Sequence, residues 1–528
     1  MFHTAGVVEV ASLATYLFYR TFEPTQLASH LTLLLLVPSA LVRYLYPADD
    51  FSAYSSAFLQ YWSSILVFTA VYRLSPLHPL AQYPGPFFAK TSKLWAAYIT
   101  FKEGNLHWTI QELHAKYGAV VRVGPNELSF ASADAIEPIL AAKQFPKGPY
   151  YNSRRQGELI PLDGYLKDYE GDVHDKVKQL VDALETRAKK GETVNISDWM
   201  SFFGFDFMGS MMHDFGMLKA GNDVDGLWHL LESGVKLVGW ASHISWVLPI
   251  LKYLPGSEEA ATQLSILAKR LVKARIEIGM HRKDLFYYLM DEKDSSRIDK
   301  AQFDSLTADG MMAVIAGSDT TAKALSQLWY FLARNPQYYE KLRKEVLLEN
   351  EGDLNRQASM PYLNACINEA LRMYPPVISG LQRRLEYGSG GKVVADHFVP
   401  EGTQISVHLF SIQRSSRHFY PLPDTFRPDR WLTNQTYMLP NDEVIPASEV
   451  KTDKSVFLPF SAGPQSCVGK GVAIIEMRAV TDAVVRRFES MDIEGRQSIA
   501  SFENWERCLR DVYVQVRGPL MVKLKLSQ

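Results

Sequence analysis

The chain has 528 residues, of which 47% are apolar and 22% charged, and its formal net charge is −2. This composition is typical of globular proteins with ample material for a core. The near-neutral charge, without a basic cluster interleaved with aromatic residues, argues against a nucleic-acid partner. The three cysteines, Cys366, Cys467 and Cys508, form no close pair. Their spacing therefore indicates neither a disulfide framework nor a zinc site, and it fits a reducing compartment.

Residues 1–75 differ from the rest because they contain three apolar runs, Gly6–Tyr19, Leu27–Leu45 and Ala57–Tyr72. A helix that crosses a bilayer needs about 20 apolar residues. The second and third runs approach this length, whereas the first is short and carries Glu9. We predict that this region is a membrane anchor with one to three transmembrane helices. The alternative is a set of amphipathic helices packed on a soluble body.

A proline-rich stretch, residues 76–90, follows the apolar runs. Proline fixes φ and lacks a backbone donor, so closely spaced prolines stiffen a connection and exclude helix. The prolines of this stretch are Pro76, Pro79, Pro84 and Pro86. We interpret the stretch as a hinge between the anchor and a globular domain over residues 91–528.

The globular domain reads as mainly α-helical with a small β-sheet region. Apolar residues at helical spacing predict helices over Leu106–Tyr117, Tyr169–Lys190 and Phe202–Met217, and a long helix that begins near Gln302. Alternating and β-branched residues predict short strands over Ala119–Val123 and Glu127–Phe130, and a terminal hairpin over Val512–Lys525.

The middle of the long helix carries the sequence Ala316-Gly317-Ser318-Asp319-Thr320-Thr321. Glycine loosens a helix and Ser or Thr compete for its backbone, so these residues cost stability in a buried helix. A Gly–Ser pair also permits a kink. One opened turn would give room for a ligand, and the hydroxyl and carboxylate of Thr320 and Asp319 would give a path for protons. Taken alone, the motif fits a notch for helix packing equally well.

Two charged residues, Glu369 and Arg372, lie three apart on a helix that ends before Pro375-Pro376. This spacing places both on one face, so they can form an ion pair. If the pair lies on the surface, it contributes at most about 1 kcal/mol.

Cys467 lies in a loop with Gly463 and Gly469, directly before a segment with helical periodicity. The positive end of a helix dipole and free backbone N–H groups both favour thiolate over thiol. Glycines without Cβ let a flat partner approach closely. The arrangement is suited to presenting a thiolate to iron. For an isolated cysteine, a buried structural role would be the alternative.

The loop's pattern, Phe460-x2-Gly463-x3-Cys467-x-Gly469, resembles the haem-binding loop of the cytochrome P-450 family, the haem-thiolate monooxygenases. The resemblance extends from about Pro84 to the end of the chain. It implies the cytochrome P-450 fold and haem b, with its iron bound by the Cys467 thiolate. The cofactor-binding residues that it implies are Phe460, Gly463, Gln465, Cys467, Gly469 and Arg383. Gln465 departs from the pattern, because the family usually has Arg or His there to contact a haem propionate.

The resemblance also assigns roles to the other motifs. Asp319 and Thr320 become the proton-delivery pair of the oxygen-activating helix. Glu369 and Arg372, with Arg430 from the segment Phe426-Arg-Pro-Asp-Arg-Trp431, become a buried structural triad that supports the cysteine loop. The residues that would line the substrate pocket are Ala316, Gly317, Val377 and Ile378.

One segment of the family pattern is missing. Between Phe145–Tyr151 and the helix near Tyr169, the family has a loop and a further helix that carries Trp or His with Arg against a propionate. Here only Asn152–Asp168 fills the gap, with Arg154 and Arg155 as the local cations of that kind. A shortened variant, an alternative transcript and a faulty gene model would each explain the gap.

The resemblance implies that one oxygen atom from O2 is inserted into an apolar small molecule, with electrons from NADPH–cytochrome P-450 reductase and, as an optional donor, cytochrome b5. The anchor and hinge are most similar to those of fungal members that act on terpenoids or aromatics in secondary metabolism. This implies the endoplasmic reticulum membrane, with the catalytic domain facing the cytosol. One alternative is a haem-thiolate isomerase or dehydratase without a reductase, against which the Asp319–Thr320 pair argues. The other is a non-catalytic remnant or truncated gene product, which the missing segment supports.

Overall fold

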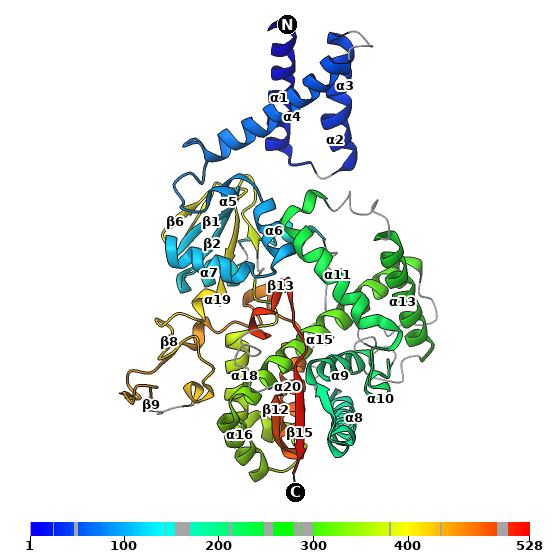
Figure 1. Ribbon diagram of the computed structural model, residues 1–528, viewed down its shortest axis with the longest axis vertical. Helices are drawn as coiled ribbons and strands as arrows, with labels where there is room; N and C mark the ends of the chain where they lie inside the picture. Colours follow the sequence, from blue (N-terminus) through cyan, green and yellow to red (C-terminus); the bar gives the residue numbers. More distant parts are fainter. Residues whose placement is uncertain are drawn as a thin grey trace.

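The computed structural model describes residues 2–24, 26–46, 51–142, 144–153, 169–210, 214–247, 257–278, 287, 299–379, 382–432, 436–493 and 505–527. Figure 1 shows a group of N-terminal helices at one end of a mainly helical body, with the C-terminus at the opposite end. The sheets of the body are small, as the sequence predicts.

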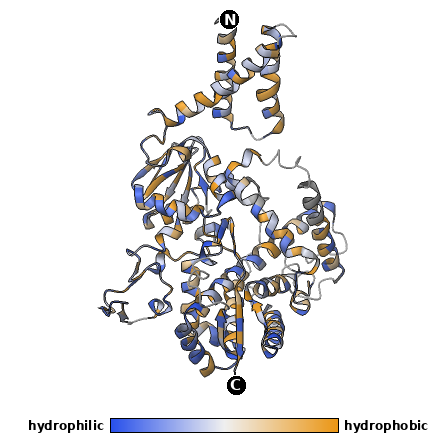
Figure 2. Ribbon diagram, viewed as in Figure 1, coloured by the Kyte–Doolittle hydropathy of each residue, from blue (hydrophilic) through white to orange (hydrophobic). Residues whose placement is uncertain are grey.

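Each of the three N-terminal apolar runs is helical. They form α1 (Phe2–Phe22), a continuous segment made of α2 (Leu27–Leu31), η1 (Thr32–Leu36) and α3 (Val37–Leu45), and α4 (Phe51–Leu74). Among the described residues, the segment Leu27–Leu45 is the one that is long and apolar enough by composition to cross a membrane. Figure 2 shows hydrophobic residues along all of these helices.

A four-stranded sheet lies next to the N-terminal helices. Its order is β1 (Val120–Gly124), β2 (Glu127–Phe130), β7 (Gln404–Val407) and β4 (Arg383–Arg384). The first two strands are antiparallel and β2 pairs with β7 in parallel. They agree within one residue with the predicted strands. The helices α5 (Phe87–Thr91), α6 (Leu94–Lys102) and α7 (Leu106–Tyr117) precede this sheet.

The largest hydrophobic core surrounds α15 (Lys300–Arg334), which packs against α9 (Ile196–Ser210), α13 (Ser257–Ile278), α18 (Pro361–Met373) and α20 (Lys470–Arg487). Asp299 precedes α15 and forms a capping box. The Asp299 carboxylate accepts from the Gln302 N–H, and the Gln302 side-chain oxygen accepts from the Asp299 N–H. The helix is continuous for 35 residues, so the Gly–Ser pair does not interrupt it.

The remaining elements complete the body. The helices are α8 (Glu170–Lys189), α10 (Met217–Ala220), α11 (Leu227–Ala241), α16 (Pro336–Leu348), α17 (Leu354–Ser359) and α19 (Leu409–Ile412). The short strands are β5 (Lys392–Val394), β6 (His397–Val399), β8 (Phe419–Tyr420), β9 (Tyr437–Met438), β10 (Val444–Ile445) and β11 (Lys451–Thr452).

The helix predicted over Phe202–Met217 differs in the structure. The helix α9 begins at Ile196 and ends at Ser210. The buried carboxylate of Asp206 accepts from the backbone N–H groups of Met217 and Leu218, at 2.9 and 2.8 Å. Residues 214–216 are not helical, and this carboxylate holds the beginning of the separate helix α10, so Met217 belongs to a second element and not to α9.

The predicted terminal hairpin over Val512–Lys525 is also wrong. The hairpin consists of β13 (Arg510–Val512) and β14 (Val514–Val516), whereas β15 (Met521–Leu526) pairs with β12 (Phe488–Ile493) and β3 (Thr193–Asn195). Alternate residues of β15, Val522 and Leu524, are buried in the main core. Burial of this face of β15 selects β12 and β3 as its partners. A local sequence pattern does not specify which distant strands these are.

Candidate functional site

The motif of α15 lies on a turn that is partly exposed, with Asp319 on its buried side. Residues 321–333 of α15 are buried, but Ala316 is exposed and Gly317 and Thr320 are partly exposed. The Thr320 hydroxyl donates to the Ala316 carbonyl at 2.6 Å. The middle of a core helix therefore offers a hydroxyl and a small-residue surface to a neighbouring molecule.

The cysteine loop lies at the beginning of α20, which packs against α15. Cys467 is exposed, and its backbone N–H donates to the Phe460 carbonyl at 2.9 Å. Phe460 packs on the edge of the main core, and Gly469 stands at the N-cap of α20. Cys366 contrasts with this cysteine, because it is fully buried and burial raises its pKa well above the usual value. Cys467 thus has the exposure and helix-end position that a reactive thiolate requires.

Gly463 holds the cysteine loop against residues 137–141. Its φ is +72°, and an added Cβ would lie 2.5 Å from both the Leu140 carbonyl oxygen and the Ala141 Cα. Both contacts are with backbone, which cannot rotate away. Glycine is therefore required here for its conformation and for its small size.

We expect Gly463→Ala to displace the cysteine loop. The measurement is haem content after purification, which should fall severalfold while the far-ultraviolet circular dichroism of the body is retained. Gly234→Ala in α11 is the matched control, because an added Cβ there would meet no described heavy atom within 4 Å and Gly234 lies outside the cysteine loop. Equal haem content in the Gly463 and Gly234 variants would contradict this role for Gly463.

The close crossing of α9 and α15 accounts for Gly317. A Cβ on Gly317 would lie 2.6 Å from the Met208 sulfur, and a Cβ on Gly204 would lie 2.5 Å from the Ser318 carbonyl oxygen. The two glycines thus let the helices approach at the motif itself. This geometry favours the packing notch as the reason for Gly317, while Ala316 and Thr320 remain accessible.

Asp319 forms an ion pair that the sequence interpretation did not include. Its carboxylate contacts the Lys323 ammonium one turn later, and both side chains are almost completely buried. Burial lowers the pKa of Lys323, and the Asp319 charge opposes this shift. Burial also lowers the pKa of the nearby Arg517, and the Asp319 charge opposes this shift. The i,i+4 spacing of Asp319 and Lys323 is the signal that could have revealed the pair.

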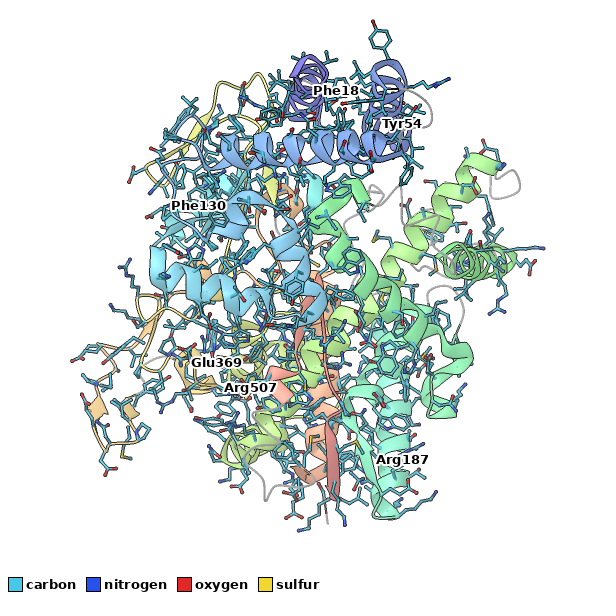
Figure 3. The ribbon with its side chains drawn as sticks, turned by 45° about the horizontal axis from the view of Figure 1, so that its top comes forward. Phe18, Tyr54, Phe130, Arg187, Glu369 and Arg507 are labelled. Atoms are coloured by element: carbon cyan, nitrogen blue, oxygen red, sulfur yellow. The ribbon has the colours of Figure 1, made fainter. Side chains whose placement is uncertain are left out.

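The predicted triad is assembled in the interior. Glu369 accepts from Arg372 Nε at 2.8 Å and from Arg430 Nε at 2.9 Å, and the three side chains are completely buried. Burial alone would raise the pKa of Glu369, but the two guanidinium groups outweigh it and hold this pKa at about 2. Figure 3 shows Glu369 inside the body, away from Phe18 and Tyr54 of the N-terminal helices.

Glu369 also organises the segment before the cysteine loop. It accepts from the Arg427 N–H and from Trp431 Nε1, both at 2.9 Å. The Trp431 ring packs edge-on against Phe457, with 4.7 Å between ring centroids. Phe457 precedes Phe460 by three residues. A chain of direct contacts therefore joins the buried carboxylate to the beginning of the loop, and Trp431 is a part of it that the motif analysis missed.

The remaining cofactor-binding candidates occupy different environments. Arg383 is buried, and its guanidinium donates to the Gln382 carbonyl at 3.2 Å. Burial lowers the pKa of Arg383, and the neighbouring Tyr151 hydroxyl opposes this shift. Gln465 is exposed in the turn before Cys467. Arg154, Arg155 and the rest of the short segment Asn152–Asp168 from residue 154 onward lie outside the described residues.

The two residues after α18 that were expected to line the substrate pocket differ in their exposure. Ile378 is buried in the main hydrophobic core, whereas Val377 is partly exposed. Val377 therefore has the exposure that a pocket-lining residue needs. The next two residues, Gly380 and Leu381, lie outside the described part of the chain.

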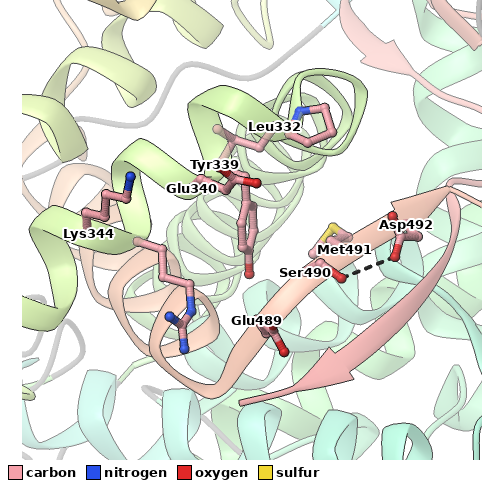
Figure 4. A pocket seen from close by; sticks show the side chains of 10 residues that line it. Leu332, Tyr339, Glu340, Lys344, Glu489, Ser490, Met491 and Asp492 are labelled. Atoms are coloured by element: carbon pink, nitrogen blue, oxygen red, sulfur yellow. Dashed lines mark hydrogen bonds between the residues drawn. The ribbon is translucent and has the colours of Figure 1, made fainter. Parts of the chain in front are cut away.

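A groove of about 320 Å³ lies between α16 and β12 (Figure 4). Its lining mixes cations, including Arg343 and Lys344, with the carboxylates of Glu340, Glu489 and Asp492. Such a lining selects neither anions nor apolar ligands. Since the predicted site residues do not line this groove, we assign it no part in the site.

The residues present fit a haem-thiolate centre. Cys467 supplies one exposed sulfur before a helix N-terminus, and the space beside Gly469 is open toward the described residues. At Gly463, by contrast, the backbone of Leu140 and Ala141 fills the space where a side chain would lie. The loop is therefore anchored on one face and accessible on the other, as binding of a flat cofactor requires.

Comparison with known proteins gives the same result. The family model "Cytochrome P450" matches residues 158–513. The chain is similar to the cytochrome P450 monooxygenase FCK2 of Fusarium pseudograminearum, with 30% identity over 80% of this chain and 78% of the relative. It is also similar to the cytochrome P450 monooxygenase nodW of Hypoxylon pulicicidum, with 31% identity over 83% and 82%. Cytochrome P450 67 of Uromyces fabae is 29% identical over 94% and 95%. The chain therefore belongs to the cytochrome P450 family and is an oxygen-incorporating oxidoreductase of the fungal type.

Proposed function

We propose that Cys467 is the axial ligand of haem b in a monooxygenase of fungal secondary metabolism, which transfers one atom of O2 to an apolar small molecule such as a terpenoid or aromatic compound. The observation that carries this proposal is the exposed Cys467 at the beginning of α20, a helix packed on α15 with its accessible Thr320. The named relatives, monooxygenases of fungi, support the fungal setting.

Haem, when bound, supplies the activation of O2 and its insertion into a C–H bond. The residues of this chain supply position and protons. Thr320 presents a hydroxyl on the exposed turn, while Ala316 leaves space beside it. Asp319 is next in the chain but is held by Lys323 in the interior. We infer that a proton reaches Thr320 from this buried pair, with Lys323 positioning the carboxylate.

The proposed partners follow from the reaction. The electrons come from NADPH–cytochrome P450 reductase, with cytochrome b5 as an optional second donor. The N-terminal helices hold the enzyme in the endoplasmic reticulum membrane, with the catalytic domain in the cytosol. The described residues on the membrane side of the body include exposed Phe87, Phe88 and Trp246, which an apolar substrate dissolved in the bilayer would meet first.

The experiment that tests this proposal is the absorption spectrum of the reduced, carbon-monoxide-bound protein. A thiolate-ligated haem gives a distinctive long-wavelength band, and a haem with a neutral ligand does not. We expect the thiolate band together with NADPH consumption in the presence of the reductase. A protein without haem would contradict the proposal and would support the non-catalytic remnant.

We expect Thr320→Ala to retain haem but to misdirect protons, since it removes the accessible hydroxyl of α15. The fraction of NADPH electrons recovered as peroxide or excess water should rise severalfold. The matched control is Ser326→Ala, which removes a similar bond, from Ser326 Oγ to the Ala322 carbonyl, in the buried part of the same helix. Unchanged coupling in the Thr320 variant, or equal loss in the control, would contradict the assignment.

A further inference from the structure

The N-terminal helices expose more large apolar side chains than they bury. Where α1, α3 and α4 meet, Val8 and Val42 form a small apolar cluster with Ala57 and Tyr61. The other side chains buried there are mainly small or polar, and they include Ser12, Thr15 and Ser64. Other large apolar side chains are exposed, among them Val10, Leu13, Leu17, Phe22, Leu36, Leu59, Leu66, Val67 and Val71. Soluble helices bury their apolar face. Small residues at helix contacts and apolar residues outside are instead typical of helices packed within a bilayer.

Three hydrogen bonds pair polar groups of different helices at these contacts. The Tyr61 hydroxyl of α4 lies 2.6 Å from the Thr15 hydroxyl of α1 and donates to the Leu33 carbonyl at 2.9 Å. The Ser64 hydroxyl donates to the Glu9 carboxylate at 3.1 Å. These bonds connect all three helical segments. In hydrocarbon, where no water is present to replace them, such pairing is required.

The hydroxyl groups on the outer surface of α4 are satisfied within the helix. Ser56, Ser63 and Thr69 each donate to a carbonyl of the preceding turn, at 3.0, 3.0 and 2.8 Å. These groups therefore present no unpaired donor to a lipid. The serine, threonine, glutamine and tyrosine residues lower the mean hydropathy of α1 and α4, which explains why composition alone selects the segment Leu27–Leu45.

The end of the bundle nearest the body is fixed to it. Glu23, at the turn after α1, accepts from Arg384 at 2.7 Å and from the Tyr387 hydroxyl at 3.3 Å. At the end of α4, Arg73 donates to the Thr91 carbonyl at 2.6 Å. Figure 1 shows the N-terminus at the far end of the bundle. The turn after α1 therefore lies on the same side as the catalytic domain.

We propose that all three helical segments cross the bilayer as one preassembled unit. With 21, 19 and 24 residues and a rise of 1.5 Å per residue, they span about 28–36 Å, which matches a hydrocarbon core of about 30 Å. The N-terminus and the connection between Tyr46 and Phe51 then face the side opposite to the catalytic domain, and the Glu23 turn faces the same side. This inference rests on the proposed anchoring and is independent of the haem chemistry.

The test is glycosylation mapping of the full chain in microsomes of a eukaryotic host. An extended loop with an N-glycosylation acceptor is inserted between Tyr46 and Phe51 in one variant and between Pro24 and Gln26 in another. A third variant carries the acceptor after Gln528. A fourth variant carries the acceptor in an extension before Met1. We expect glycans on the first and fourth variants, since the Tyr46–Phe51 loop and the N-terminus are lumenal, and none on the other two. The carbon-monoxide spectrum of each variant shows separately whether the catalytic domain remains folded and haem-loaded.

Each other result overturns the proposal. A glycan on the loop between Pro24 and Gln26 would show that this loop is lumenal, so the three segments do not all cross. A glycan after Gln528 would place the catalytic domain in the lumen. An N-terminal acceptor without a glycan would show that α1 does not cross. The absence of a glycan from the Tyr46–Phe51 loop would show that the helices do not carry that loop across. None of these results would alter the haem spectrum, so failure of the topology and failure of the monooxygenase assignment are distinguishable.

Discussion

Cys467→Ala is expected to abolish the thiolate-type carbon-monoxide band and all substrate oxygenation. The reason is chemical: the substitution removes the sulfur at the start of α20, and the exposed residues around it, Gly463 to Ser466, offer no equivalent iron ligand. Neither of the other cysteines can replace it, because Cys366 is buried in the core and Cys508 lies beside Gly518, outside the cysteine loop. The measurement is the reduced difference spectrum together with product formation.

The matched control is Cys508→Ala, which also removes an exposed thiol. It should leave the spectrum and turnover within the error of the parent protein. Circular dichroism of the Cys467 variant establishes that the fold is intact. A normal band in folded Cys467→Ala protein would exclude this cysteine as the ligand.

Glu369→Ala is expected to destabilise the body by about 3–5 kcal/mol, because it leaves Arg372 and Arg430 as buried charges without their partner. It also removes the acceptor for Trp431 and the Arg427 N–H. The product should be apoprotein or aggregate, measured as haem yield and thermal midpoint. The matched control is Glu489→Ala, which breaks an exposed pair with Lys525 and should cost less than about 1 kcal/mol.

The low pKa of the Glu369 carboxylate also leads us to expect that the stability of the protein depends on pH. The folded pKa of Glu369, about 2, lies below the usual value, about 4.3 in an unfolded chain. Its contribution to stability is therefore complete above the unfolded pKa and is lost as the pH falls toward about 2. The parent protein should show this loss in acid melts. A stable, haem-loaded Glu369→Ala protein would show that the buried network is dispensable.

The sequence predicted the parts of the fold that local patterns specify. The strands near Val120 and Glu127, the helix Leu106–Tyr117 and the long helix follow from periodicity and capping, which depend on neighbours in the chain. The partners of β15 could not be predicted, because strand pairing over hundreds of residues depends on which faces are buried.

The positions of several site residues could be predicted, whereas their roles stay predictions. The residues of the cysteine motif and the three charged residues of the triad could be identified from the sequence, because they match the family pattern. The neighbours that complete their environment, such as Trp431 and Lys323, were missed because their importance depends on burial. Two opposite charges four residues apart on a helix are interpreted as a surface ion pair unless both groups are known to be buried.

The crossing of α9 over α15 has a mechanical consequence. The backbone of Gly204 lies directly against the Ser318 carbonyl, and the backbone of Gly317 lies directly against the Met208 side chain. Because no space is left at either contact, neither helix can move toward the other. Close-packed interiors transmit strain, so any displacement of α9 would be carried directly into the turn that holds Thr320. If Thr320 delivers protons as we propose, enlarging either glycine would change both the helix crossing and the fraction of electrons that reaches product.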